Sequence, residues 1–123
     1  RVLRVALWLN VALNAFGAVI FGQVAVGGAS AFLPVAMPRF AAGQIAWVIA
    51  LFGLVYGWQA IAPRINCGLI AVGGLGKVGF FLLTVAYWLA GDLPGQMAAN
   101  ATPDLLFGLL FLSKARGDST ARD

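Results

Sequence analysis

A single lysine, Lys77, lies inside a long apolar stretch of this sequence. It occupies the centre of the segment GGLGKVGFF (residues 73–81), and apolar residues continue for many positions on both sides. An amine in such surroundings can pair with a carboxylate, bind an anion, or exchange a proton. The residues with the chemistry to engage it are the carboxylate of Asp104 and the uncharged groups of Asn10, Asn14 and Tyr56.

The glycines around Lys77 are open to two interpretations. Residues 74–79 match G-x-G-x-x-G, which binds dinucleotides when it follows a strand, but here the match lies inside a continuous apolar run. We therefore interpret the small residues as positions where membrane helices approach one another closely. The predicted packing positions are Gly73, Gly76 and Gly79 (spaced by three), Gly53 and Gly57 (a G-x-x-x-G pair), and Ala18 and Gly22.

The composition is that of a membrane protein. Of the 123 residues, 62% are hydrophobic and 10% are charged, and the mean hydropathy is +0.93, whereas soluble domains carry about 25% charged residues. The chain has no histidine and one cysteine, Cys67, so we expect no internal disulfide, no metal site and no histidine-ligated haem or chlorophyll. The basic residues lie at the ends of apolar runs, which is not the pattern of a nucleic-acid-binding protein.

Four segments have the length of about 20 residues that a membrane-spanning helix needs. They are roughly residues 2–26, 43–62, 67–90 and 96–113, followed by a polar tail at 114–123. The predicted fold is all-α: one domain, residues 1–123, forming a four-helix transmembrane bundle. The excess of Lys and Arg on one side predicts that both termini are cytoplasmic. That side holds Arg1, Arg4, Arg64, Lys114, Arg116 and Arg122, and the other side holds Arg39.

Counting 1.5 Å per residue places Lys77 about 15 Å from the cytoplasmic end of its helix, near the middle of the bilayer. Asn14 lies at nearly the same depth, and Asn10 lies one turn closer to the cytoplasm. Asp104 lies about 12 Å from the outer edge, if its helix begins at Gln96. Because side chains lean toward their helix N-terminus, Lys77 and Asp104 would lean apart. The geometry therefore does not favour a direct ion pair, and solvation of Lys77 by Asn10, Asn14 and backbone carbonyls stays open.

The stretch from Leu51 to Leu112 resembles a group of small, uncharacterised bacterial four-helix integral membrane proteins. The resemblance rests on a Gly-x-x-Gly-Lys run (Gly73 to Lys77), a Gly-x-Leu-Pro turn (residues 91–94) and the segment Asp-Leu-Leu-Phe-x-Leu-Leu-Phe-Leu (residues 104–112). It implies a multi-pass protein of the bacterial inner (cytoplasmic) membrane, and it singles out Lys77 together with Asp104.

Three classes of function fit these features. The first is a non-enzymatic structural or accessory subunit that packs against a larger membrane complex, or against further copies of itself, within the lipid bilayer. The second is a small oligomeric transporter or channel that uses Lys77 and Asp104 inside the membrane. The third is a binder of a lipid-soluble molecule such as a quinone, a carotenoid or a lipid. No cofactor is expected otherwise, but a bound lipid, quinone or pigment fits this class. Because the acid–base groups form no convergent set, the sequence favours a protein that is not an enzyme.

Overall fold

The structure is a computed structural model that describes residues 1–121, with side chains through residue 117. All regular structure in this part of the chain is helical, which confirms the predicted all-α class. The helices are α1 (Val2–Ala25), α2 (Arg39–Ile61), α3 (Cys67–Leu89), the short α4 (Gly95–Asn100) and α5 (Thr102–Ala121). Three of them, α1, α2 and α3, are long and apolar enough to cross a membrane, which supports the prediction of a membrane protein.

The helix boundaries differ from the predicted ones in three places. The second helix begins at Arg39 instead of residue 43. It starts directly after Pro38, which has no backbone N–H to donate to a preceding helical turn. The predicted fourth segment is divided at Ala101 into α4 and α5, because Pro103 lacks a backbone N–H and constrains the residues before it. The predicted polar tail is not separate from the helix: α5 runs through it to Ala121.

Local signals in the sequence explain several of the observed ends. The Asn66 side chain accepts a hydrogen bond from the Leu69 backbone N–H at 3.1 Å and so caps the start of α3. Gly27 and Gly91, which follow the ends of α1 and α3, have positive φ angles of 92° and 88°. Glycine reaches this left-handed conformation without a steric penalty and is therefore common just past a helix end.

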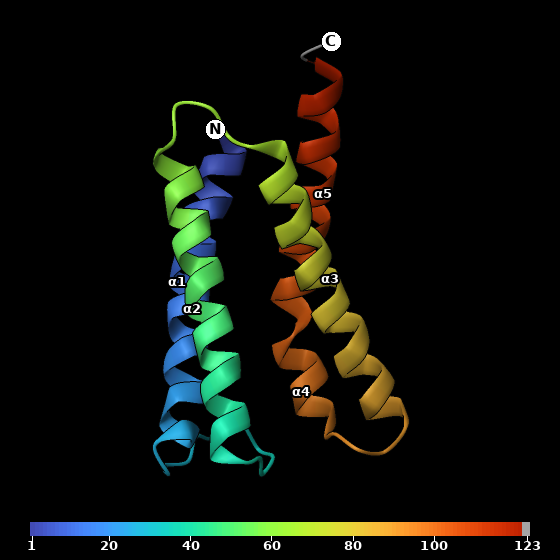
Figure 1. Cartoon of the computed structure of the whole chain (residues 1–123). Helices are drawn as coiled ribbons and strands as arrows, with labels where there is room; N and C mark the ends of the chain where they lie inside the picture. The colour runs from blue at the N-terminus through green and yellow to red at the C-terminus, as the bar shows by residue number, and fades with distance from the viewer. Residues whose placement is uncertain (122–123) are drawn as a thin grey trace.

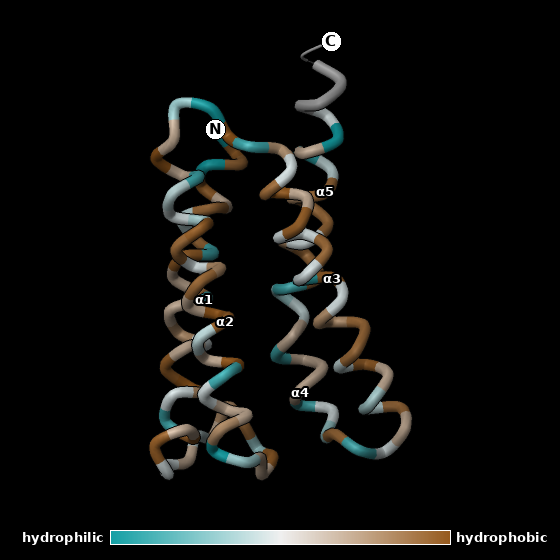
Figure 2. The backbone as a smooth tube through the Cα atoms, viewed as in Figure 1, coloured by the Kyte–Doolittle hydropathy of each residue, from teal (hydrophilic) through white to brown (hydrophobic). Residues whose placement is uncertain are grey.

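The helices form two antiparallel pairs that stand side by side (Figure 1). One pair is α1 with α2, and the other is α3 with α4 and α5. The start of α1 and the end of α5 lie at the same end of the molecule, and we call this the N-terminal end (Figure 1). Hydrophobic residues run along the helices, while hydrophilic residues gather mainly in the loops and at the helix ends (Figure 2).

The two pairs are joined at both ends of the molecule. Toward the N-terminal end they share an apolar core. At the opposite end, the side chains of Gln96 and Asn100 donate hydrogen bonds to the backbone carbonyls of Ala31 and Phe32, both at 3.2 Å. The members of the apolar core are Leu3, Ala6, Leu7, Tyr56, Ala60, Ile70, Phe111 and Ala115.

Candidate functional site

Lys77 and Asp104 form a direct ion pair between α3 and α5. The Lys77 Nζ lies 3.0 Å from the Asp104 Oδ1 and donates a hydrogen bond to it. The exposed fractions of the two side chains are 7% and 22%, so the pair lies largely inside the protein. The expectation that the geometry disfavours this pair was wrong: the two side chains reach each other although both lean toward the N-terminus of their own helix.

A close approach of α3 and α5 sets the register that brings the pair together. A Cβ added to Gly74 would lie 2.9 Å from the Gly108 carbonyl oxygen, and one added to Gly108 would lie 3.0 Å from the Gly74 carbonyl oxygen. Lys77 lies three residues further along α3, and Asp104 lies four residues back along α5. Because the two helices are antiparallel, both residues reach the same level. Gly108 was missed in the sequence, although it is the one glycine within the apolar part of this helix.

The break at Ala101 gives Asp104 a second favourable interaction. It makes Asp104 an acidic residue in the first turn of α5, where the positive end of the helix dipole stabilises a negative charge. The carboxylate thus combines the positive end of a helix with the ammonium group of Lys77. In a helix that ran unbroken from Gln96, Asp104 would have had the ammonium group of Lys77 as a partner but not the positive end of a helix.

Tyr56 links this ion pair to the other helix pair. The Lys77 Nζ lies 5.4 Å from the centroid of the Tyr56 ring, within the range of a cation–π interaction. The ring packs on Gly73, where an added Cβ would lie 2.9 Å from the Tyr56 Cε1. Its centroid also lies 5.4 Å from that of Phe111 on α5. The structure therefore brings three predicted residues, Lys77, Asp104 and Tyr56, into one cluster.

The side chains of Asn10 and Asn14 donate hydrogen bonds to backbone carbonyls of α1 and α2, and not to Lys77. The Asn14 Nδ2 donates to the Ile49 carbonyl oxygen at 2.9 Å and so ties α1 to α2. The Asn10 Nδ2 donates to the Ala6 carbonyl oxygen of its own helix at 2.8 Å. Asn10 is 0% exposed, and its Oδ1 is a buried oxygen for which the structure shows no hydrogen-bond partner.

The predicted packing residues divide into inward-facing and outward-facing groups. Gly53 and Gly57 face α1, since added Cβ atoms would lie 3.2 Å from the Asn14 Cβ and 3.5 Å from the Val11 Cγ2. By contrast, a Cβ at Gly76, Gly79 or Gly22 would meet nothing within 4 Å. The predicted row of Gly73, Gly76 and Gly79 is therefore not one interface. Ala18, paired with Gly22 in the prediction, is half-buried.

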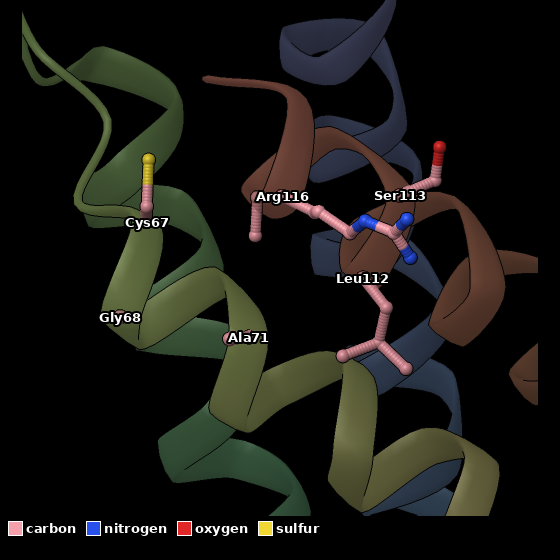
Figure 3. Close-up of a pocket in the computed structure, with 7 residues that line it drawn as sticks. Cys67, Gly68, Ala71, Leu112, Ser113 and Arg116 are labelled. Carbon is pink, nitrogen blue, oxygen red and sulfur yellow. The ribbon is translucent and has the colours of Figure 1, made fainter. Parts of the chain in front are cut away.

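A pocket of about 550 Å³ lies between α3 and α5 at the N-terminal end (Figure 3). It was not predicted from the sequence. Among the residues whose side chains are described, no group of three or more His, Cys, Asp or Glu residues could hold a metal ion. The residues that line the pocket are Cys67, Gly68, Ala71, Leu112, Ser113, Ala115 and Arg116.

Comparison with known proteins finds no match to a family model, to a curated protein or to a solved structure. The possible activities of the chain therefore follow from the chemistry of its own residues. Its chemical centre is a buried ammonium–carboxylate pair, stacked on a tyrosine ring, at the junction of three helices.

Proposed function

We propose that this chain is a non-enzymatic, multi-pass protein of the bacterial inner membrane that packs as an accessory subunit against other membrane-protein subunits. In this proposal α4 and α5 together form a fourth span beside α3, and both termini are cytoplasmic. Two features support the fourth span: α5 packs antiparallel to α3, and Asp104, which would be costly in lipid, is paired with Lys77. The basic residues at the N-terminal end support the orientation.

The observation that carries the accessory role is the outward face of α3. Gly76 and Gly79 lie on this face, at the level of Lys77, and a Cβ added at either residue would meet no neighbouring helix or packed side chain of the described structure within 4 Å. Small residues allow a second helix to approach closely in lipid, where packing contacts drive association. The inward-facing glycines Gly74 and Gly108 already bring α3 and α5 together in this way. We infer that Gly76 and Gly79 receive a helix of another subunit.

The ion pair supports a structural role over transport. Lys77 and Asp104 neutralise each other within one helix pair, and Tyr56 covers the ammonium group from the side of α2. A transporter would need at least one of these charges to face a path through the membrane. In the accessory-subunit proposal the pair instead fixes the angle at which α3 presents Gly76 and Gly79.

The test is the size of the assembly after gentle extraction from the native membrane. The variant Gly76→Leu/Gly79→Leu adds bulk where the structure has open space, so its helix content and stability should equal those of the wild type. Its association with other subunits should weaken at least about tenfold, which corresponds to about 1.4 kcal/mol. The control is Gly22→Leu, which adds one leucine side chain to an open position on α1 and should leave the assembly intact.

Two results would refute the accessory role. One is a wild-type protein that migrates as a single chain under the gentlest extraction. The other is a double variant that assembles as well as the wild type, since the outward face of α3 would then make no intersubunit contact.

A further inference from the structure

The chain joins the two helix pairs to each other at the N-terminal end only. Residues 62–66, which link α2 to α3, lie at that end (Figure 1). Residues 26–38 and 90–94 lie at the opposite end, which we call the far end, and each of these loops joins helices of the same pair (Figure 1). At the far end, therefore, only non-covalent contacts hold the α1–α2 pair against the pair formed by α3, α4 and α5.

The N-terminal end of this junction is tightly packed. All four long helices contribute buried residues to the apolar core there. The ring of Tyr56 lies against Gly73 and its centroid is 5.4 Å from that of Phe111, so α2 contacts both α3 and α5. The linker is fixed as well, since the Gln59 Oε1 accepts a hydrogen bond from the Asn66 backbone N–H at 2.6 Å. These contacts hold the two pairs together at this end.

The far end of the junction is held by two exposed hydrogen bonds. The side chains of Gln96 and Asn100 donate to the carbonyl oxygens of Ala31 and Phe32, both at 3.2 Å. Water competes for exposed donors and acceptors, so the net strength of such bonds is small. Among the described helices, α1 and α5 make the main close approach across the junction, whereas α2 and α3 hardly approach each other. Figure 1 shows α3 leaning away from α2 toward the far end.

A lipid environment does not close the far end by itself. Apolar helix surfaces gain nothing by leaving lipid for one another, so packing and polar contacts must hold them together. The ion pair between Lys77 and Asp104 lies within one helix pair, and separating the two pairs leaves it intact. No charge is therefore left unpaired when the far end opens.

We propose that the two helix pairs form a hinge: the α1–α2 pair swings away from the α3–α5 pair at the far end, about the apolar core and residues 62–66. The loop of residues 26–38 is the latch. It is closed when the side chains of Gln96 and Asn100 bind its carbonyl groups, and open when water replaces them.

Opening exposes the ion pair to the surroundings of the far end. Asp104 is already 22% exposed, whereas Lys77 is 7% exposed, and Lys77 is covered on one side by the Tyr56 ring of the other helix pair. The hinge does not depend on the accessory role, because Gly76 and Gly79 face away from the junction. Either proposal can therefore fail without the other.

The test measures distances between two nitroxide labels by pulsed electron paramagnetic resonance. The full chain, in a Cys67→Ser background, is placed in lipid nanodiscs and diluted with unlabelled chain. The far-end pair of labels is attached at Trp47→Cys and Leu83→Cys, and the hinge pair at Trp58→Cys and Val72→Cys. All four positions are exposed on α2 or α3. The far-end distances should be distributed more broadly than the hinge distances, with a second population at longer distance.

The latch is tested by removing its two hydrogen bonds. In Gln96→Ala/Asn100→Ala, the population at long far-end distance should rise at least about threefold, while the hinge distances stay unchanged. The matched control is Gln23→Ala/Gln44→Ala, which removes two exposed amide side chains near the same end of α1 and α2 and should behave as the wild type. Equal helix content by circular dichroism confirms that each variant folds.

Three outcomes would overturn the proposal. The first is a far-end distribution that Gln96→Ala/Asn100→Ala leaves unchanged. The second is equal broadening of the hinge pair, which would mean that the whole bundle loosens instead of turning about one end. The third is an equal rise of the long-distance population in Gln23→Ala/Gln44→Ala, since the latch would then not lie at Gln96 and Asn100.

Discussion

The ion pair between Lys77 and Asp104 makes the strongest prediction about stability. In Lys77→Met the carboxylate of Asp104 stays in place but loses the ammonium group that lies 3.0 Å from it. Removing one partner of a buried pair costs about 3–5 kcal/mol, because the remaining charge is left uncompensated. Asp104 is 22% exposed and gains support from the start of α5, so we expect the lower value, about 3 kcal/mol. That equals a change of roughly a hundredfold in the unfolding equilibrium.

The double variant Lys77→Met/Asp104→Leu removes both charges together. A buried ion pair replaced by apolar residues of similar volume is often neutral or stabilising. The double variant should therefore recover most of the loss, so the two substitutions are non-additive, with a coupling energy of at least about 2 kcal/mol between the two sites. The assay is reversible unfolding in mixed micelles of mild detergent and dodecyl sulfate, followed by far-ultraviolet circular dichroism. Lys114→Met, which removes a cation that is not paired with Asp104, is the control and should change stability by less than about 0.5 kcal/mol.

Additive effects would refute this reasoning. If Lys77→Met and Asp104→Leu each destabilise the protein and the double variant loses the sum, the two charges do not stabilise each other. The pair would then not hold α3 against α5.

Three further predictions follow from the packing and the topology. Gly108→Ala should lower the free energy of unfolding by about 1–3 kcal/mol, because its Cβ would lie 2.7 Å from the Val78 Cγ2; an unchanged value in the micelle assay would place the helix crossing elsewhere. Asn10→Leu should raise that free energy by about 1 kcal/mol, because it removes a buried oxygen without a partner; a decrease would show that this oxygen has one. In intact cells an impermeant thiol reagent should label Asp92→Cys in a Cys67→Ser background but not the native Cys67, and labelling of both or of neither would contradict the proposed orientation of α3 across the membrane.

Much of the fold could be predicted from the sequence because the bilayer imposes a simple length rule. Apolar runs of about 20 residues located all the long helices, and the residue types alone identified Lys77 and Asp104 as the charges that need a partner. The contact between them could not be predicted, because it depends on where α5 begins and how closely it crosses α3. The crossing lies at Gly74 and Gly108, and Gly108 was not recognised in the sequence as a packing position.

The direction in which each glycine faces was also beyond the sequence pattern. At about 100° per residue, a spacing of three residues turns the helix back by about 60°, so Gly73 and Gly79 point about 120° apart. Gly73 therefore receives Tyr56, while Gly79 faces outward. A run of small residues marks close approach but does not say which helix approaches. Only the positions of the neighbouring helices decide that.

The most direct test of the accessory-subunit proposal is native mass spectrometry of the full chain, extracted gently from its own membrane. The proposal predicts a complex with one or more other membrane polypeptides at fixed stoichiometry, which Gly76→Leu/Gly79→Leu dissociates and Gly22→Leu does not. A single chain that carries only lipid, or a homo-oligomer that the double variant leaves intact, would contradict it.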